Sequence, residues 1–239
     1  MRRAILLALT LTGCATGPSG LSDETRSRIE GRAVVTAESD AAEARRASAQ
    51  FGNPTPWTAP LFGTVVSVLG DFNESSRSRV GAVPAPERDP TPAARAAVVD
   101  YMVSALGGVR GGRPLDATGI EATSPGARAE AIFGRAQQRG FPGVVVDLQP
   151  VVFRVRSAGV GTGLRAERFY LDYEASLVVV DAADGTLIAR GRCEVDTRAT
   201  AVMLAELEAG GTALLDQASD LASRQCAAQL IQGRLLPAS

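Results

Sequence analysis

The stretch FYLDYEASLVVVDAADGTLIARGRCEV, residues 169–195, decides the fold. Apolar and polar residues alternate along residues 169–179 and again along 187–195, with the period of two that is typical of strands with one buried face. Between these two runs lies Ala183-Asp184-Gly185, a three-residue loop whose glycine suits the left-handed position. The stretch therefore predicts a long β-hairpin.

This loop also fixes the register of the hairpin. A slip by one residue would turn Arg190 and Arg192 toward the core, so the register is strongly specified. The cross-strand pairs that we expect are Ala175 with Cys193, Leu177 with Gly191, and Val179 with Ala189.

A helix is expected after the hairpin, over residues 206–235, with a start after Gly210-Gly211 as the alternative. Its apolar residues recur at helical spacing and form one stripe. We expect this stripe to pack on the apolar face of the hairpin. Its members are Leu215, Ala218, Leu221, Ala222, Cys226 and Leu230.

Start and stop signals predict two helices before the hairpin. Thr91-Pro92 is an expected N-cap followed by proline, and this helix should end at Gly107-Gly108. Ser124-Pro125 repeats the start signal for a helix over residues 127–139, with Gly140 as the residue that ends it.

Two further strands are expected. Residues 61–72 form a β-branched and aliphatic run that suits a buried strand. Residues 143–156 predict another strand that Pro150 interrupts, because proline cannot donate to a ladder. Pro150 therefore indicates either an edge strand or a bulge.

Together these elements predict an α+β fold, with a mostly antiparallel sheet, a long C-terminal hairpin and helices packed on one face. We expect a signal peptide over residues 1–13, a lipidated tether and weakly ordered segment over 14–60, and a single domain over 61–239. Within the weakly ordered segment, residues 23–33 and 39–51 are either short helices or disordered.

The composition excludes several classes of catalysis. The 239 residues contain no histidine, and all 25 basic residues are arginine. Catalytic triads that need histidine, zinc sites built on histidine, and Schiff-base chemistry on lysine are therefore excluded within this chain. The net charge of −1 gives no global positive field for nucleic acid.

Residues 1–14 have the features of a secretory signal. Arg2 and Arg3 precede a short apolar run that ends in Leu11-Thr12-Gly13-Cys14, and the run is too short to span a bilayer. These four residues resemble a lipobox, the cleavage and acylation site of bacterial lipoproteins. The alternative is a plain cleaved signal with an incidental cysteine.

The resemblance implies that the mature protein begins at Cys14, with a diacylglycerol on its sulfur and an acyl chain on its amino group. Two or more chains give stable anchoring. Ala15 replaces the aspartate that retains enterobacterial lipoproteins in the inner membrane. We therefore expect attachment to the outer membrane, facing the periplasm, with the inner membrane and the cell surface as alternatives.

The two remaining cysteines, Cys193 and Cys226, fall on faces that should meet, in a compartment where disulfides form. A bond between them would close a loop of 33 residues (226 minus 193) and contribute about 3 to 4 kcal/mol. The alternative is two separate buried thiols.

The outward face of the hairpin is charged, with Asp172, Glu174 and Glu194 among its carboxylates. One interpretation is a solvated face with cross-strand charge pairs. The other is a binding surface whose arginines take carboxylate or phosphate groups. Its candidate arginines are Arg154, Arg156, Arg165, Arg168, Arg190 and Arg192.

The order of strand, long hairpin and amphipathic helix resembles the auxiliary lipoproteins of lipid-transport ABC systems, although no motif supplies functional residues to carry over. We expect a non-enzymatic scaffold or accessory subunit of an envelope complex, with no metal, cofactor or nucleic acid. It would bind the membrane through its lipid and a protein partner in the envelope. The alternative is a carboxylate-based hydrolase of cell-wall or surface polymers.

Overall fold

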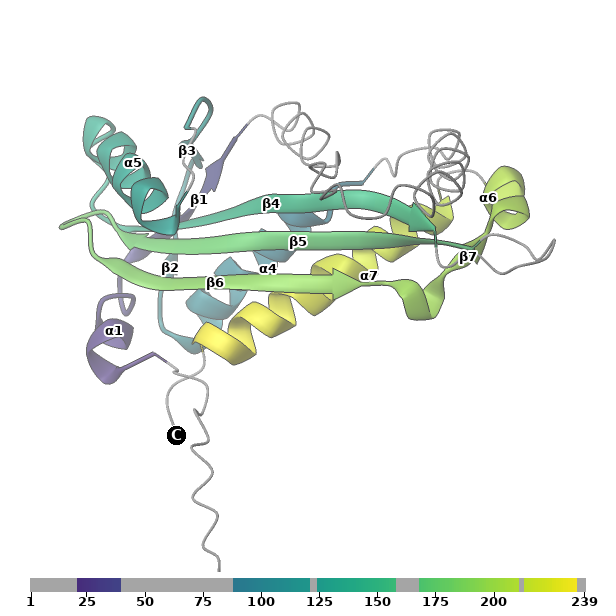
Figure 1. The fold of residues 1–239 in the computed structure, drawn as a ribbon. Helices are drawn as coiled ribbons and strands as arrows, with labels where there is room; N and C mark the ends of the chain where they lie inside the picture. Colours follow the sequence, from purple (N-terminus) through teal and green to yellow (C-terminus); the bar gives the residue numbers. More distant parts are fainter. Residues whose placement is uncertain (1–20, 40–87, 121–123, 158–167, 211–212, 236–239) are drawn as a thin grey trace, which may run out of the picture.

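The computed structural model of the chain describes residues 21–39, 88–120, 124–157, 168–210 and 213–235. They form an α+β fold with a mixed, mostly antiparallel sheet of seven strands (Figure 1). In chain order, the elements are α1 (Asp23–Ser27), β1 (Ala33–Glu38), α4 (Pro90–Ala105), β2 (Val109–Arg110), β3 (Leu115–Asp116), α5 (Pro125–Gln138), β4 (Val144–Ser157), β5 (Arg168–Asp181), β6 (Leu187–Asp196), the 3-10 turn η1 (Arg198–Thr200), β7 (Val202–Met203), α6 (Leu204–Gly210), α7 (Ala213–Leu230) and the π-helical turn η2 (Ile231–Leu235).

The sheet has the strand order β2-β1-β4-β5-β6, and the short strands β3 and β7 pair with β1 and β5. β1 runs parallel to β2, β3 and β4, whereas β4, β5 and β6 form an antiparallel meander. β6 is the last strand on its side of the sheet. Among the described residues, no strand pairs with its outer edge.

The hairpin of β5 and β6 has the predicted register. Gly185 in its loop has a φ of 79°, the left-handed conformation that the sequence predicts. The sequence did not predict a bulge at Ile188. The register shifts between Val179 and Val180, so Ile188 is an extra residue of β6 without a partner in β5. The three expected cross-strand pairs, Ala175–Cys193, Leu177–Gly191 and Val179–Ala189, all form.

Pro150 marks a bulge in β4 and not an edge, because β4 lies between β1 and β5. The register shifts between Pro150 and Val152, which leaves Val151 as an extra residue. This residue changes which side chains point to which face. After the bulge, Arg154 and Arg156 point to the same face as the odd-numbered residues before it.

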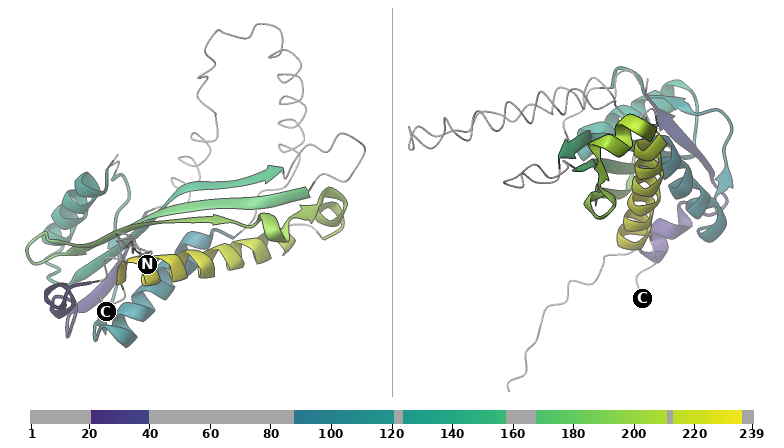
Figure 2. Two further views of the ribbon diagram at one scale, coloured as in Figure 1. Left: turned by 60° about the horizontal axis from the view of Figure 1, so that its bottom comes forward. Right: turned by 90° about the vertical axis from the view of Figure 1, so that its right-hand side faces the viewer.

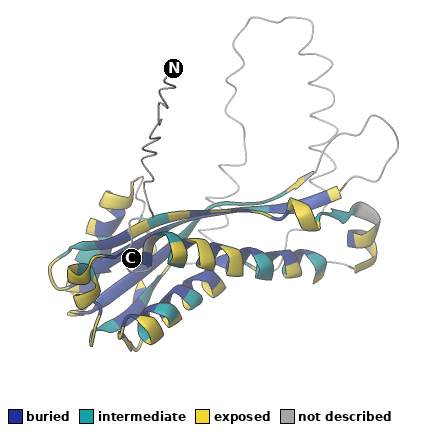
Figure 3. Cartoon of the chain, turned by 90° about the horizontal axis from the view of Figure 1, so that it is seen from below, coloured by how far each residue is buried: buried dark blue, intermediate teal, exposed yellow. Residues whose placement is uncertain are grey.

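Helices cover both faces of the sheet, which corrects the expectation that they pack on one face. α4 and α7 lie under one face and enclose the larger core cluster with β4, β5 and β6 (Figures 1 and 3). α5 packs on the opposite face at one end, where Ile132 contacts a cluster that includes Val145, Val178 and Val180. These valines make part of the second face apolar, so it also needs a cover.

The hairpin is not the C-terminal element, as the expected fold class had it, because α6, α7 and η2 follow it. α7 begins at Ala213, so the alternative start after Gly210-Gly211 is the correct one. The helix runs along the length of the hairpin (Figure 2). Of the predicted stripe, Leu221 alone is only partly buried.

The two predicted upstream helices are both present. The hydroxyl of Ser124 accepts a hydrogen bond from the N–H of Ala127 at 3.2 Å, so Ser124 is the N-cap of α5 as predicted. The N-cap of α4 is Asp89 rather than Thr91, because the Asp89 carboxylate accepts from the Thr91 N–H at 2.8 Å. Thr91 is buried instead, and its hydroxyl lies 3.0 Å from the phenol oxygen of Tyr173.

β1 is a strand that the sequence did not predict. β1 lies inside the sheet, with β4 on one side and the short strands β2 and β3 on the other. Its adjacent residues Val34 and Val35 are buried on opposite faces of the sheet. A strand buried on both faces does not alternate, so its pattern gives no period of two. The expected strand over residues 61–72 and the lipidation site Cys14 lie outside the described residues.

Cys193 and Cys226 form a disulfide, as the strand parity and the helical stripe predict, with sulfur atoms 1.98 Å apart. Both residues are completely buried. The bond ties α7 to the outermost strand, β6.

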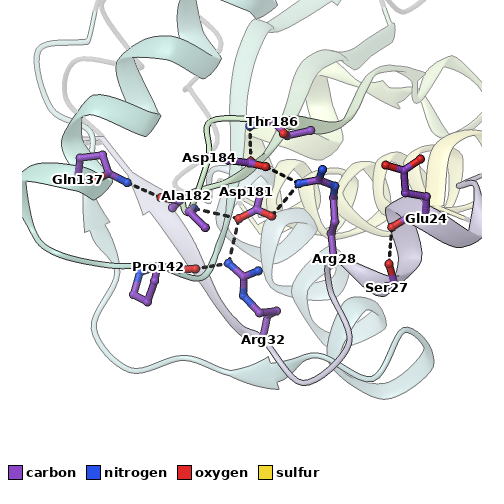
Figure 4. A network of polar contacts seen from close by, with 11 residues as sticks. Glu24, Ser27, Arg28, Arg32, Gln137, Pro142, Asp181, Ala182, Asp184 and Thr186 are labelled. Carbon is purple, nitrogen blue, oxygen red and sulfur yellow. Dashed lines mark hydrogen bonds and ion pairs between the residues drawn. The ribbon is translucent and has the colours of Figure 1, made fainter.

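The buried carboxylate of Asp181, at the end of β5, anchors the segment between α1 and β1 (Figure 4). It accepts hydrogen bonds from Arg32 at 2.9 Å, from Arg28 at 3.3 Å and from the Ala183 N–H at 2.9 Å. Arg28 also donates to Asp184 at 2.7 Å, and this bond lowers the pKa of the Asp184 carboxyl. The first strand is thereby held against the hairpin turn.

Candidate functional site

The face of β4, β5 and β6 that carries α5 at one end is charged along the rest of its length. We call this surface the charged face. Its residues occupy alternating positions of the three strands and the turn after β6. They are Arg154 and Arg156 of β4, Arg168, Tyr170, Asp172 and Glu174 of β5, Arg190, Arg192, Glu194 and Asp196 of β6, and Arg198 of η1.

Two arginines of β4 hold the carboxylate of Asp172. Arg154 lies directly opposite Asp172 and donates to it through Nε at 3.0 Å. Arg156 forms a second ion pair with the same oxygen at 3.5 Å. On its other side, Asp172 faces Asp196 of β6, so the arginines offset the repulsion between two neighbouring carboxylates.

A second set of ion pairs joins β5 and β6. Glu174 faces Glu194 directly, and Arg192 contacts both carboxylates, with its Nε forming an ion pair with Glu174 and lying 3.6 Å from Glu194. The hydrogen bond with Glu174, followed by the charges of both carboxylates, raises the pKa of Arg192 against the opposing effect of its burial. One arginine thus stabilises two facing carboxylates.

Arg198 and Tyr170 extend the charged face beyond the end of β6. The guanidinium of Arg198 lies 5.0 Å from the centre of the Tyr170 ring and donates to the phenol oxygen at 3.0 Å. Arg198 also pairs with Asp196 at 3.2 Å. Sequence analysis missed both residues, because Arg198 follows the last strand position and no periodicity places the turn over Tyr170.

Two carboxylates of the charged face, Asp172 and Glu174, lie beneath arginines that pair with them, whereas the side chain of Glu194 is 76% exposed. The Glu174 side chain is 12% exposed and the Arg192 side chain that pairs with it 59%. For Asp172 and Arg156 the values are 23% and 48%. At these two positions an approaching molecule meets guanidinium groups first, and the recessed carboxylates fix the orientation of these groups.

The structure brings together five of the six candidate arginines, all except Arg165, which lies outside the described residues. Arg154, Arg156 and Arg192 are engaged in ion pairs. Arg168 and Arg190 are exposed, and within the part of the chain that the structure describes neither forms an ion pair. These two arginines retain their full capacity to bind an anionic group.

The guanidinium groups of the charged face are of the kind that pairs with carboxylate or phosphate groups, and some of them already pair with carboxylates of the sheet. Asp172 is held by two arginines of β4, and Glu174 by Arg192 of β6. Among the described residues, no group of three or more acidic, histidine or cysteine side chains is placed to hold a metal ion.

None of the described helices combines the length and the apolar content that crossing a membrane requires. Comparison with known proteins gives no relative from which a role could be transferred. No protein-family model, no curated protein and no solved structure matches this chain.

Proposed function

We propose that this protein is a non-enzymatic binding module, anchored by lipid to the outer membrane and facing the periplasm. It serves as a scaffold or accessory subunit of an envelope complex. The observation that carries the proposal is the arrangement of Asp172 and Glu174 on the charged face, where exposed guanidinium groups lie over these two recessed carboxylates.

The geometry of this face suits an acidic protein partner. Arginines that already pair with carboxylates of their own sheet lose little conformational freedom when they bind a carboxylate of another protein. Arg168 and Arg190 add cations that no carboxylate neutralises among the described residues. Carboxylates of a partner would therefore receive charge-assisted hydrogen bonds from a surface that is already in place.

Two observations support a location in the cell envelope. The sequence Leu11-Thr12-Gly13-Cys14 resembles a lipobox. The disulfide between Cys193 and Cys226 is typical of proteins outside the cytoplasm. The lipid would keep the domain at the membrane, where an accessory subunit of an envelope complex would meet its partners.

Crosslinking in intact envelopes, followed by affinity purification of the tagged full-length chain, tests the proposal. Arg156→Glu and Arg190→Glu change exposed arginines of the charged face, and Arg113→Glu is the matched control on an exposed loop at the opposite edge of the sheet. We expect each face variant to reduce partner capture gradually, by about 1 to 3 kcal/mol for a lost charge-assisted hydrogen bond. Equal capture by all three variants would refute the charged face as the binding site.

The alternative function is a carboxylate-based hydrolase of cell-wall or surface polymers, with Asp172 and Glu174 as its acid and base. General acid and base work cannot be shared among neighbours, so Asp172→Asn would then abolish turnover by orders of magnitude. Incubation of the purified chain with peptidoglycan, glycan and ester substrates distinguishes the two functions. We expect no turnover that depends on Asp172 or Glu174.

A further inference from the structure

The outermost strand, β6, carries a charge order that is complementary to itself. On the charged face it presents Arg190, Arg192, Glu194 and Asp196, two cations followed by two anions. In an antiparallel pair of two β6 strands with Cys193 facing its own copy, Arg192 faces Glu194 and Arg190 faces Asp196. The twofold symmetry gives four pairs of opposite charge across one seam.

The outer edge of β6 also carries the backbone groups that such pairing needs. In an antiparallel ladder, successive residues direct their N–H and C=O alternately to the two neighbouring strands. The N–H of Thr197 donates to the carbonyl of Leu171 in β5, whereas the backbone of Glu194 points away from β5. The even-numbered residues Arg190 and Arg192 therefore direct their N–H and C=O to the outer edge, where no described residue bonds to them.

The side chain of Gln229 in α7 takes the place that one residue of a further strand beside β6 would occupy. Its Oε1 accepts from the N–H of Glu194 at 3.0 Å, and its Nε2 donates to the carbonyl of Glu194 at 2.9 Å. Two opposed residues in an antiparallel ladder exchange these same two bonds. A peptide group of a neighbouring strand can therefore replace the amide of Gln229 with no net loss of hydrogen bonds.

The helix beside this edge presents an uncharged stripe. Gln225, Ala228, Gln229 and Gln232 are all exposed and follow the helical spacing of i, i+3, i+4 and i+7. This stripe borders β6, because Gln229 reaches its backbone and Cys226 is bonded to it. A helix face without charge can meet a copy of itself with no electrostatic repulsion.

The position of α7 suits a helix pair below the joined strands. α7 packs against both β5 and β6, so its axis lies near the boundary between these two strands. With strands about 4.8 Å apart, the α7 helices of two copies would lie about 10 Å apart. This is close to the distance at which helices pack against each other.

We propose that the outer edge of β6 and the uncharged stripe of α7 form an interface with a second copy of this chain. The two sheets join into one, with both charged faces on the same side, and each Gln229 releases Glu194. The dimer has its own readout, the mass of the protein part. Arg190 belongs to both surfaces, whereas Arg156 lies on β4 away from the β6 edge, so Arg156→Glu tests partner capture alone.

The test uses two differently tagged full-length chains, produced together, extracted in mild detergent and purified through one tag. Light scattering with size-exclusion chromatography then gives the mass of the protein part. We expect the wild-type copies to purify together as a dimer. Glu194→Arg places arginine opposite Arg192 in both halves of the seam and should weaken the dimer roughly tenfold or more. The double variant Arg192→Glu with Glu194→Arg reverses each pair and should restore it.

Ala228→Arg tests the helix stripe without touching the strand and should also weaken the dimer. Its matched control is Ala96→Arg, at an exposed alanine of α4 on the same side of the sheet but away from β6. A monomeric wild type overturns the proposal. Association that persists in both Glu194→Arg and Ala228→Arg also overturns it, because two chains that merely share a detergent micelle would behave in this way. A double variant that folds correctly but stays monomeric overturns it as well.

Discussion

Arg128 of α5 and Asp147 of β4 form an ion pair that is almost fully shielded from water. Nε of Arg128 lies 2.8 Å from Oδ2 of Asp147, and the side chains are 4% and 3% exposed. A second bond, between the terminal nitrogen of Arg128 and Oδ1 of Asp147, measures 3.3 Å. The pair pins α5 to the sheet beside the charged face.

Removing one partner of this pair should destabilise the fold strongly, because it leaves the other charge buried and alone. For Arg128→Met we expect a loss of about 3 to 5 kcal/mol in the free energy of unfolding. The double variant Arg128→Met with Asp147→Leu should recover much of that loss. Urea unfolding at neutral pH measures both, and a single variant within about 1 kcal/mol of the wild type would contradict the prediction.

Reduction of the disulfide between Cys193 and Cys226 should lower stability. The bond closes a separation of 33 residues, which corresponds to about 3 to 4 kcal/mol of loop-closure entropy. Denaturation with and without a reductant measures this difference, and the double variant Cys193→Ala with Cys226→Ala should no longer respond to the reductant. Complete alkylation of both cysteines in unfolded, unreduced protein would show that the bond does not form.

Stability should fall at alkaline pH through Tyr173. Burial raises the pKa of its phenol above 10, against the lowering effect of the hydrogen bond with Thr91. The unfolded chain therefore loses this proton first, so stability is fully present below pH 10 and falls at higher pH. The slope is about 1.4 kcal/mol per pH unit for one proton.

Tyr173→Phe removes the phenol that causes this fall and should flatten the pH profile between about pH 10 and 11. Urea unfolding of both proteins at several pH values gives the comparison. The variant should start from a lower stability at neutral pH, because the buried Thr91 hydroxyl loses its partner. Parallel profiles for the two proteins would mean that another group causes the alkaline loss.

Lipid attachment predicts that Cys14→Ser releases the protein from membranes or leaves its precursor uncleaved. Fractionation of cells measures the release, and mass spectrometry of the wild-type N-terminus identifies the acyl chains directly. Ala15→Asp tests the sorting expectation separately and should retain the protein in the inner membrane. A wild-type N-terminus without acyl chains would remove the basis of the proposed location.

The register of the hairpin could be predicted because a slip would have buried Arg190 and Arg192, which is costly in any environment. β1 could not be predicted, since its neighbours are distant in the chain and parallel. Val34 and Val35 are buried on opposite faces, so no alternation marks the strand. The apolar stripe of a helix does not indicate which face of a sheet the helix covers. The position of α5 on the second face therefore could not be predicted.

The candidate arginines of β6, Arg190 and Arg192, followed from strand parity, whereas Arg168 of β5 was a candidate because it lies near the hairpin in the sequence. Arg154 and Arg156 reach the same face only because Pro150 is followed by an extra residue. The proline indicated a bulge but did not show which residue is the extra one. Arg198 was beyond prediction, because its contact with Tyr170 depends on a turn in which no repeating pattern exists.

The extra residue in β4 acts as a phase shift that divides the strand into two frames. Deleting Val151 would remove the bulge and join the two frames into one regular ladder, with Phe153 still opposite Tyr173 and Arg154 still opposite Asp172. A deletion in a regular part of a strand exchanges inside and outside for every later position, whereas a deletion at the bulge is absorbed by the loss of the bulge. The bulge is thus the place in β4 where the strand can lose one residue without turning any other side chain to the opposite face.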